Sequence, residues 1–325
     1  MKRLSYLILL TLVLVSCGTK SDHFTLEGRL LNLNQGEFYV YSTDGLINDI
    51  DTIHVQAGRF SYDIECTTNG TLVIVFPNFS EQPVFAQPGK SCNLEGDASK
   101  LKEARVKGTK ENKLMNQFRE QIESASPDEI RHYAELFVGD HPESLVSIYL
   151  VRKYFITCQN SDYKKADKLL KIIQKAQPEN GRLKQLIDQV EAQAQTAIGS
   201  PLPKFKVVDI NGDTITQAKF SKGDAIIYVW ATWEYESCNM QRNLKNTVKD
   251  KATCLGICLD ADKTEYKKLL DRENIDLPIV FDGKMFDSPL VKKLGFTSIP
   301  DNIVVKNGKI TGRNLTLQQI REKFN

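Results

Sequence analysis

The chain has 325 residues, which predicts two or three domains at the usual size of roughly 100–200 residues each. Hydrophobic residues make up 41% and charged residues 26%, ordinary globular values that exclude a disordered, collagen-like or coiled-coil chain. With 43 basic and 41 acidic residues the formal charge is +2, so the composition carries no electrostatic footprint for nucleic acid, and we expect no such partner. A mean hydropathy of −0.34 with a single long apolar run excludes a polytopic membrane protein.

That apolar run lies at the extreme N-terminus. Lys2 and Arg3 precede Leu4–Val15, a stretch that is shorter than the ~20 residues a membrane-spanning helix needs. A basic start followed by a short apolar core is typical of a secretory signal peptide. We therefore predict a signal peptide over residues 1–16.

The run ends in Leu14-Val15-Ser16-Cys17, which resembles the lipobox of bacterial lipoproteins. This resemblance implies cleavage before Cys17, lipidation of that cysteine and a short polar tether over residues 17–23. The mature chain would then be anchored by its acyl chains to the inner or outer membrane of the cell envelope, facing the periplasm. The alternative is a plain signal peptide followed by an incidental cysteine.

Six cysteines remain once Cys17 is set aside, in a compartment where disulfides persist. No two of the seven cysteines are spaced as C-x-x-C and their spacing fits no zinc site, so we expect neither a metal nor another cofactor. Cys254 and Cys258 lie in one apolar, strand-like segment. Four residues of strand span about 13 Å, whereas a disulfide needs Cα atoms about 4.4–6.8 Å apart. These two cysteines are therefore predicted to be separate buried thiols.

Residues 24–108 show the alternation of apolar and polar side chains that is typical of strands. Ala57-Gly58 separates two such segments as in a hairpin. Seven or so short strands with turn signals between them predict a β-rich domain, an antiparallel sandwich or barrel. The clearest segments are Phe24–Leu30, Gly36–Tyr41, Asp51–Val55, Arg59–Ile64, Thr71–Phe76 and Ser91–Glu95.

Residues 109–197 change to a helical period. Ser126-Pro127-Asp128-Glu129 combines an N-cap residue, a first-turn proline and two acids, which predicts a helix start. One buried helix face is predicted from apolar side chains at i, i+3 and i+4 spacing, namely Leu183, Leu186, Ile187, Val190 and Ala194. We predict several antiparallel helices here, without catalytic residues.

Gly199-Ser-Pro-Leu-Pro203 is predicted to be an exposed linker that few contacts cross. Beyond it, apolar strands such as Ala225–Trp230 and Cys254–Leu259 alternate with helical patterns such as Asn239–Lys249. Asn307-Gly308 opens a closing hairpin. This order predicts an α/β domain with a mixed sheet over residues 198–325, and an α+β multidomain protein as a whole.

Trp230-Ala-Thr-Trp233, which closes a strand and precedes a helix, resembles a segment of membrane-anchored thioredoxin-like proteins of the TlpA/ResA type. The resemblance extends to Gly199–Pro203, to Asn211-Gly212 and to Gly295–Pro300, which matches the loop that holds the family's cis-proline. It implies a thioredoxin-like domain over residues 198–325 with a cis peptide before Pro300. The layout also resembles envelope lipoproteins in which a β-rich domain of unknown function and a helical region precede such a domain.

The chain departs from this family at the redox motif. The resemblance places C-x-x-C directly after Trp233, but these four positions read Glu234-Tyr235-Glu236-Ser237. Dithiol exchange needs one thiolate that attacks and a second thiol that resolves the mixed disulfide. A carboxylate and a hydroxyl can do neither. In this register, ordinary dithiol exchange at Glu234 and Ser237 is excluded.

Cys238 is the one thiol next to the motif, and it leaves two readings of function open. As a reactive monothiol it would have its pKa lowered by the first helical turn and opposed by Glu234 and Glu236. No histidine follows His141, so no Cys–His dyad can form in this domain. The alternative is an ordinary residue at a helix start. Trp230 and Trp233 are predicted to pack in the core and the motif loop.

We therefore expect a lipid-anchored, periplasm-facing protein whose thioredoxin-like domain is a binding module. Its groove beside Pro300 would accept an envelope protein or peptide, as the groove of the parent family does, without catalysis. The alternative hypothesis is an enzyme, a monothiol oxidoreductase of the thiol-disulfide interchange family that uses Cys238. Whether this thiol is exposed with a lowered pKa, or packed away, discriminates between the two.

Overall fold

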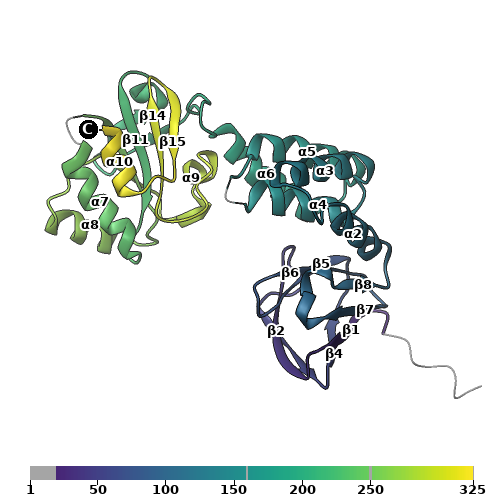
Figure 1. The fold of residues 1–325 in the computed structure, drawn as a ribbon. Helices are drawn as coiled ribbons and strands as arrows, with labels where there is room; N and C mark the ends of the chain where they lie inside the picture. The colour runs from purple at the N-terminus through teal and green to yellow at the C-terminus, as the bar shows by residue number, and fades with distance from the viewer. Residues whose placement is uncertain (1–19, 159, 249–250, 325) are drawn as a thin grey trace, which may run out of the picture. The chain divides into compact units, whose positions relative to one another are not determined.

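The structure is a computed structural model that describes residues 20–158, 160–248 and 251–324. The described chain forms two compact units (Figure 1). The first runs to Cys158 and adds Ile172–Arg182, and the second takes the rest. Among the helices of these ranges, none is long and apolar enough to cross a membrane. Cys17, the predicted lipidation site, lies outside the described residues.

The first unit begins with a strongly curved β-sheet. Its eight strands follow the order β6-β5-β2-β3-β4-β1-β7-β8. One face of the sheet encloses a hydrophobic core. Strand β4 shows the pattern: Phe60, Tyr62 and Ile64 point into the core, and the residues between them are exposed. The strands are β1 (His23–Leu31), β2 (Gln35–Ser42), β3 (Asp51–Gln56), β4 (Arg59–Glu65), β5 (Gly70–Val75), β6 (Glu81–Ala86), β7 (Lys90–Asp97) and β8 (Arg105–Lys107), with the 3-10 helix η1 (Ala98–Glu103) before β8.

This sheet confirms the predicted barrel-like domain and corrects one part of that prediction. All neighbouring strands are antiparallel except β1 and β7, which pair in parallel from Phe24 with Lys90 to Leu31 with Asp97. A parallel pair needs a long connection, and here the five strands β2–β6 supply it. Strand β6 was not predicted. Its Pro83 argues against a strand, and it fits because β6 is an edge of the sheet.

Helix α2 (Lys110–Gln121) lies between the two edges that this sheet leaves unpaired. The Asn112 amide accepts a hydrogen bond from the Phe85 N–H of β6 at 2.9 Å and donates one to the Phe85 carbonyl at 3.0 Å. One turn later, the Asn116 amide makes the same two bonds with Val106 of β8, at 3.3 and 2.7 Å. Two asparagine side chains thus replace a missing strand at both edges.

The helices that follow confirm the predicted helical region. Helix α3 starts at the predicted Ser126, whose side chain and that of Glu129 form a capping box. On α6 the predicted face is buried at Leu183, Leu186, Ile187 and Val190, while Ala194 is half-buried. The helices are α3 (Pro127–Asp140), α4 (Leu145–Val151), the π-helix η2 (Arg152–Ile156), α5 (Tyr163–Ala176) and α6 (Gly181–Gln195).

The second unit is built on a mixed sheet of order β13-β12-β11-β14-β15, in which β11 is parallel to β12 and antiparallel to β14. Alternate residues of β11 enter two different cores, so both faces of the sheet are covered. Helices α7, α8 and α10 contribute to one core and α9 to the other (Figure 1). The strands of the unit are β9 (Lys206–Val208), β10 (Thr214–Thr216), β11 (Asp224–Trp230), β12 (Thr253–Cys258), β13 (Ile279–Phe281), β14 (Asp301–Lys306) and β15 (Lys309–Arg313). The helices are η3 (Gln217–Phe220), α7 (Tyr235–Val248), α8 (Lys263–Arg272), η4 (Met285–Asp287), α9 (Pro289–Lys293) and α10 (Leu317–Phe324).

The segment Gly199–Pro203 is not the exposed linker that its composition predicts. The Gly199 N–H donates to the Ile310 carbonyl at 2.8 Å, and the Ile310 N–H donates to the Ser200 carbonyl at 2.9 Å. Leu202 is buried in the core of the second unit. The two prolines leave enough backbone donors for the segment to lie along β15, so it is a paired part of the domain predicted over residues 198–325 and not a boundary that few contacts cross.

Candidate functional site

The site predicted from the sequence lies where β11 ends and α7 begins. The motif loop, Ala231–Glu234, joins these elements. Two buried groups fix it: the Ser237 hydroxyl accepts from the Ala231 N–H at 3.0 Å, and Asp260 accepts from the Thr232 N–H at 2.9 Å. Asp260 is not among the site residues predicted from the sequence, although an acid directly after an apolar, strand-like segment is a visible signal.

Glu234 occupies the N-terminus of α7. Its carboxylate accepts hydrogen bonds from the Ser237 N–H at 2.5 Å and the Glu236 N–H at 3.1 Å. These are amides of the first turn, which have no acceptor within the helix, and the positive end of the helix dipole stabilises an anion there. The carboxylate thus caps the helix at the position where the family places its attacking thiolate.

Ser237, in the position of the resolving thiol, is a structural residue. It is fully buried, and its hydroxyl lies 3.0 Å from the Ala231 carbonyl and 2.9 Å from the Glu234 carbonyl, two acceptors for its single proton. Together with the bond from the Ala231 N–H, these contacts fold the loop onto the helix. The site therefore contains no pair of thiols that could exchange.

Cys238 is packed away. It is 5% exposed, and its Sγ lies 3.1 Å from the Ala231 carbonyl, to which the thiol donates. Burial raises the pKa of this thiol, with smaller contributions in the same direction from Asp260 and Glu234, against Arg242 and Arg272. Of the two readings that the sequence leaves open for Cys238, a buried thiol with a raised pKa agrees with the ordinary residue at a helix start.

The two tryptophans of the motif have different environments. Trp230 is fully buried in the core beneath α7, as predicted. Trp233 is 55% exposed and the neighbouring Tyr235 is 73% exposed. The packing role predicted for both tryptophans therefore holds for Trp230 only, and the loop presents two aromatic rings to solvent.

The loop before β14 lies beside the motif loop. Val229 pairs with Asp301 in the β11–β14 register, which brings Pro300 opposite Trp230 one residue further on. The Ile299–Pro300 peptide is cis, as the resemblance implies. Ser298 is exposed, and across the described chain no backbone hydrogen bond involves Ser298 or Ile299. Free main-chain groups thus lie next to the end of β11.

Asp301 follows the cis-proline and is almost fully buried. It accepts from the Asn302 N–H at 2.6 Å, and Arg313 lies 3.7 Å away. Burial raises the pKa of this carboxyl to about 6, although Arg313 and the backbone donors act in the opposite direction. Arg313 also donates to the Gly295 carbonyl and to the Thr196 hydroxyl of the segment after α6, so this network holds the loop against that segment.

Neither a metal-binding cluster nor a disulfide is found in the parts of the chain that the structure describes. Over these residues, no group of three or more His, Cys, Asp or Glu side chains could hold a metal ion. Six cysteines are free thiols there, and the predicted pair Cys254 and Cys258 is buried. The site offers the backbone groups of Ser298 and Ile299 and the exposed rings of Trp233 and Tyr235.

We predict that Glu234→Ala lowers the free energy of unfolding by about 1 kcal/mol, because two first-turn amides lose their acceptor. Glu236→Ala is the matched control, because it removes the same charge from an exposed side chain two residues later. It is expected to lower the free energy of unfolding by less than about 0.5 kcal/mol. Both tryptophans of the chain belong to this domain, so urea unfolding followed by tryptophan fluorescence reports on it alone. Equal losses for the two variants would contradict the capping role.

A second prediction concerns pH. The folded-state pKa of Asp301 is about 6, whereas an unfolded aspartate titrates near roughly 3.9. Between these values the folded state holds a proton that the unfolded state has lost, so stability falls as pH rises, by up to about 1.4 kcal/mol per pH unit.

Asp301→Asn removes this pH dependence. The free energy of unfolding of the variant, relative to that of the wild type, therefore rises between pH 4 and 6 in the same fluorescence assay. Asp287→Asn is the control, because the pKa of exposed Asp287 is lowered by Lys292, 2.7 Å away, and its small effect has the opposite sign. A constant difference between Asp301→Asn and wild type over this range would refute the raised pKa.

Comparison with known proteins agrees with this geometry. Residues 24–115 match the family described as "Domain of unknown function (DUF4369)", and residues 198–313 match the AhpC/TSA family. The chain is 30% identical over 110 residues to "Thiol:disulfide interchange protein DsbE" of Pseudomonas fluorescens biotype C, covering 33% of this chain and 60% of the relative. It is 26% identical over 119 residues to "Thiol-disulfide oxidoreductase ResA" of Bacillus thuringiensis subsp. konkukian, covering 35% and 66%. The chain thus spans less than two thirds of the length of these relatives.

Two solved structures are also similar. A thiol-disulfide oxidoreductase from Bacteroides fragilis is 22% identical at a TM-score of 0.34, over 38% of this chain and 96% of the other. A thioredoxin-like protein from Bacteroides caccae is 13% identical at a TM-score of 0.46, over 61% and 77%. From the family matches, the related sequences and the sheet order, residues 198–313 form a thioredoxin-fold domain of the TlpA/ResA-like type, and it follows a DUF4369 domain.

Proposed function

We propose that this protein is a lipid-anchored, periplasm-facing binding protein whose thioredoxin-like domain holds extended polypeptide segments without exchanging disulfides. The observation that carries the proposal is the carboxylate of Glu234 on the N-terminal amides of α7, 2.5 Å from the Ser237 nitrogen. An anion already satisfies the donors that would stabilise a thiolate in a redox-active relative.

The chemistry of exchange supports the loss of catalysis. The relatives are named for thiol-disulfide interchange, which needs an attacking and a resolving thiol. Glu234 and Ser237 supply neither, and the chain has no C-x-x-C elsewhere. Cys238 is 5% exposed with a raised pKa, so a monothiol mechanism would begin with a thiol that is both inaccessible and protonated.

The loop beside Pro300 supports the binding role. An extended polypeptide can add to free backbone through main-chain hydrogen bonds, which give affinity with little sequence preference. Ser298 and Ile299 have such free groups in the described structure. Trp233 and Tyr235 expose apolar rings on the neighbouring loop, and rings of this kind bury a large area on contact. Together they favour unfolded or extended segments of envelope proteins as partners.

We predict that the wild-type protein reduces insulin no faster than the dithiol reductant alone, and that Cys238→Ser changes nothing. The double variant Glu234→Cys with Ser237→Cys restores both thiols at the helix N-terminus and is expected to raise the rate above this background. Wild-type turnover that disappears in Cys238→Ser would overturn the proposal and establish the monothiol enzyme instead.

The lipid anchor rests on the sequence pattern around Cys17. Cells fed radiolabelled palmitate are expected to label the wild-type protein, and Cys17→Ser is expected to accumulate as an unlabelled precursor of larger size. Cys66→Ser is the control, since this buried cysteine is remote from the lipobox and its variant should still be labelled. Label on Cys17→Ser would refute lipidation at this residue.

A further inference from the structure

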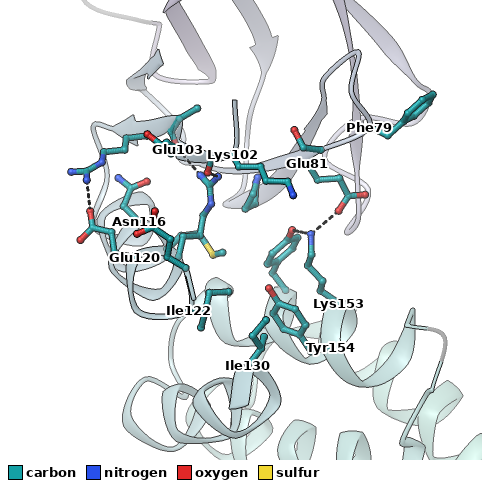
Figure 2. A pocket seen from close by; sticks show the side chains of 18 residues that line it. Phe79, Glu81, Lys102, Glu103, Asn116, Glu120, Ile122, Ile130, Lys153 and Tyr154 are labelled. Atoms are coloured by element: carbon teal, nitrogen blue, oxygen red, sulfur yellow. Dashed lines mark hydrogen bonds and ion pairs between the residues drawn. The ribbon is translucent and has the colours of Figure 1, made fainter. Parts of the chain in front are cut away.

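A cavity of about 810 Å³ lies within the first unit, between the barrel edge and the helices packed on it. One side is formed by β6 and the residues before it together with the end of η1, and the other by α2, the start of α3 and the α4–η2 segment (Figure 2). Its volume is in the range of roughly 300–1,000 Å³ that small-molecule sites occupy. None of its lining residues belongs to the thioredoxin-like domain.

The helical side of the cavity combines polar residues with a group of apolar and aromatic ones. Met115, Ile122 and Ile130 line it with aliphatic side chains, and Tyr149 and Tyr154 add two aromatic rings. Figure 2 shows Ile122, Ile130 and Tyr154 directed from the helices towards the open space. Such a wall accepts the hydrocarbon or ring portion of a ligand and excludes water from it.

Two cations of the lining are neutralised by acids. The Lys153 ammonium lies 2.8 Å from the Glu81 carboxylate and 3.2 Å from the Tyr149 hydroxyl. Arg105 pairs with Glu120 at 3.0 Å. These groups give the rim polarity but carry no excess charge.

The other two cations lack a counter-ion. Arg119 donates only to neutral acceptors, namely the Gln82 amide, the Ala104 carbonyl and the Lys102 carbonyl. The described residues offer no acceptor to its remaining N–H groups. The Lys102 ammonium has no acidic partner within the same part of the chain, and Figure 2 shows its side chain extending into the cavity. Of the other acids, Glu103 pairs with Lys100 at 3.2 Å, and Glu123 is exposed, as Lys102 is, so the lining as a whole holds four acids and four bases.

The backbone is distorted where it meets the cavity. Arg152–Ile156 forms a π-helix at the end of α4, and it carries Lys153 and Tyr154 into the lining. A π-helical turn, with its i→i+5 hydrogen bonds, is rare in proteins and is found frequently at functional sites. The Tyr154 hydroxyl has no hydrogen-bond partner among the described residues and can serve a ligand.

We propose that this cavity binds a small organic monoanion, a carboxylate on an aromatic or aliphatic body, with the carboxylate at Arg119 and Lys102 and the body against Tyr149, Tyr154 and Ile130. A planar guanidinium without a counter-ion suits a carboxylate, and the apolar wall suits a body of about ten carbon atoms. The site is independent of the polypeptide-binding role proposed for the thioredoxin-like domain.

Three probes with one body and different charges test the proposal on the full chain by isothermal titration calorimetry. They are 1-naphthaleneacetate, its neutral amide 1-naphthaleneacetamide, and the cation 1-naphthylmethylammonium. The carboxylate is expected to bind at least tenfold more tightly than the amide, with no detectable binding of the ammonium, because the charged group would lie against Arg119 and Lys102, the two cations without a counter-ion. Equal affinities for acid and amide, or binding of none of the three, would overturn the proposal.

Variants locate the binding. Arg119 also holds the barrel edge, so the tests leave it in place. Lys102→Ala is expected to weaken the carboxylate at least threefold without affecting the amide, and Ile130→Trp is expected to weaken all binding by placing a bulkier ring where the body of the ligand would lie. Lys113→Ala, an exposed residue of α2 outside the lining, is the matched control and should bind as the wild type does. Undiminished binding by folded Ile130→Trp, checked by circular dichroism, would refute the site.

Discussion

The first-turn amides of α7 need hydrogen-bond acceptors, and the rest of the site depends on which residue accepts from them. In this chain it is Glu234, whose carboxylate accepts from Glu236 and Ser237. The buried Ser237 hydroxyl then hydrogen-bonds to the motif loop at Ala231 and holds the loop against the helix. The Cys238 thiol packs against the same Ala231 carbonyl. A helix-capping carboxylate thus stands where the resemblance places the attacking thiol, within a thioredoxin-like fold.

The same sheet positions the binding groups that remain. The antiparallel pairing of β11 and β14 holds the loop before Pro300 beside the motif loop, independently of which residues fill the redox positions. Arg313 fixes that loop from behind through Gly295 and Asp301. The loop therefore presents the backbone groups of Ser298 and Ile299, on which the proposed binding of extended chains depends.

Much of this arrangement is readable from the sequence. Alternation of apolar residues and the βα order predicted both domains, and the tryptophan segment with Pro300 located the site. Three features were not predictable, for physical reasons. The parallel β1–β7 pair depends on contacts distant in sequence. Pro83 argues against a strand unless that strand is known to be an edge. The backbone of Gly199–Pro203 pairs with β15 only because the folded sheet offers an edge.

The chemical state of Cys238 and the cavity of the first unit also lay beyond the sequence. Helix position alone lowers a thiol pKa, and the opposing burial is visible only when the packing of α7 on Ala231 is known. The cavity combines residues from Phe79 to Tyr154 that no local pattern connects. In both cases the deciding quantity is solvent exclusion, which arises from tertiary structure.

Hydrogen–deuterium exchange with and without a reduced, carboxymethylated polypeptide, which is extended and has no thiols, tests the central claim most directly. The account predicts slower exchange on binding in the segment around Ser298 and in the motif loop. Ser298→Pro, which removes one backbone donor, should lose this protection, whereas Ser298→Ala, which keeps the donor, should retain it. Exchange around Ser298 that is unchanged by the polypeptide, or protection equal in the two variants, would contradict a binding role for this loop.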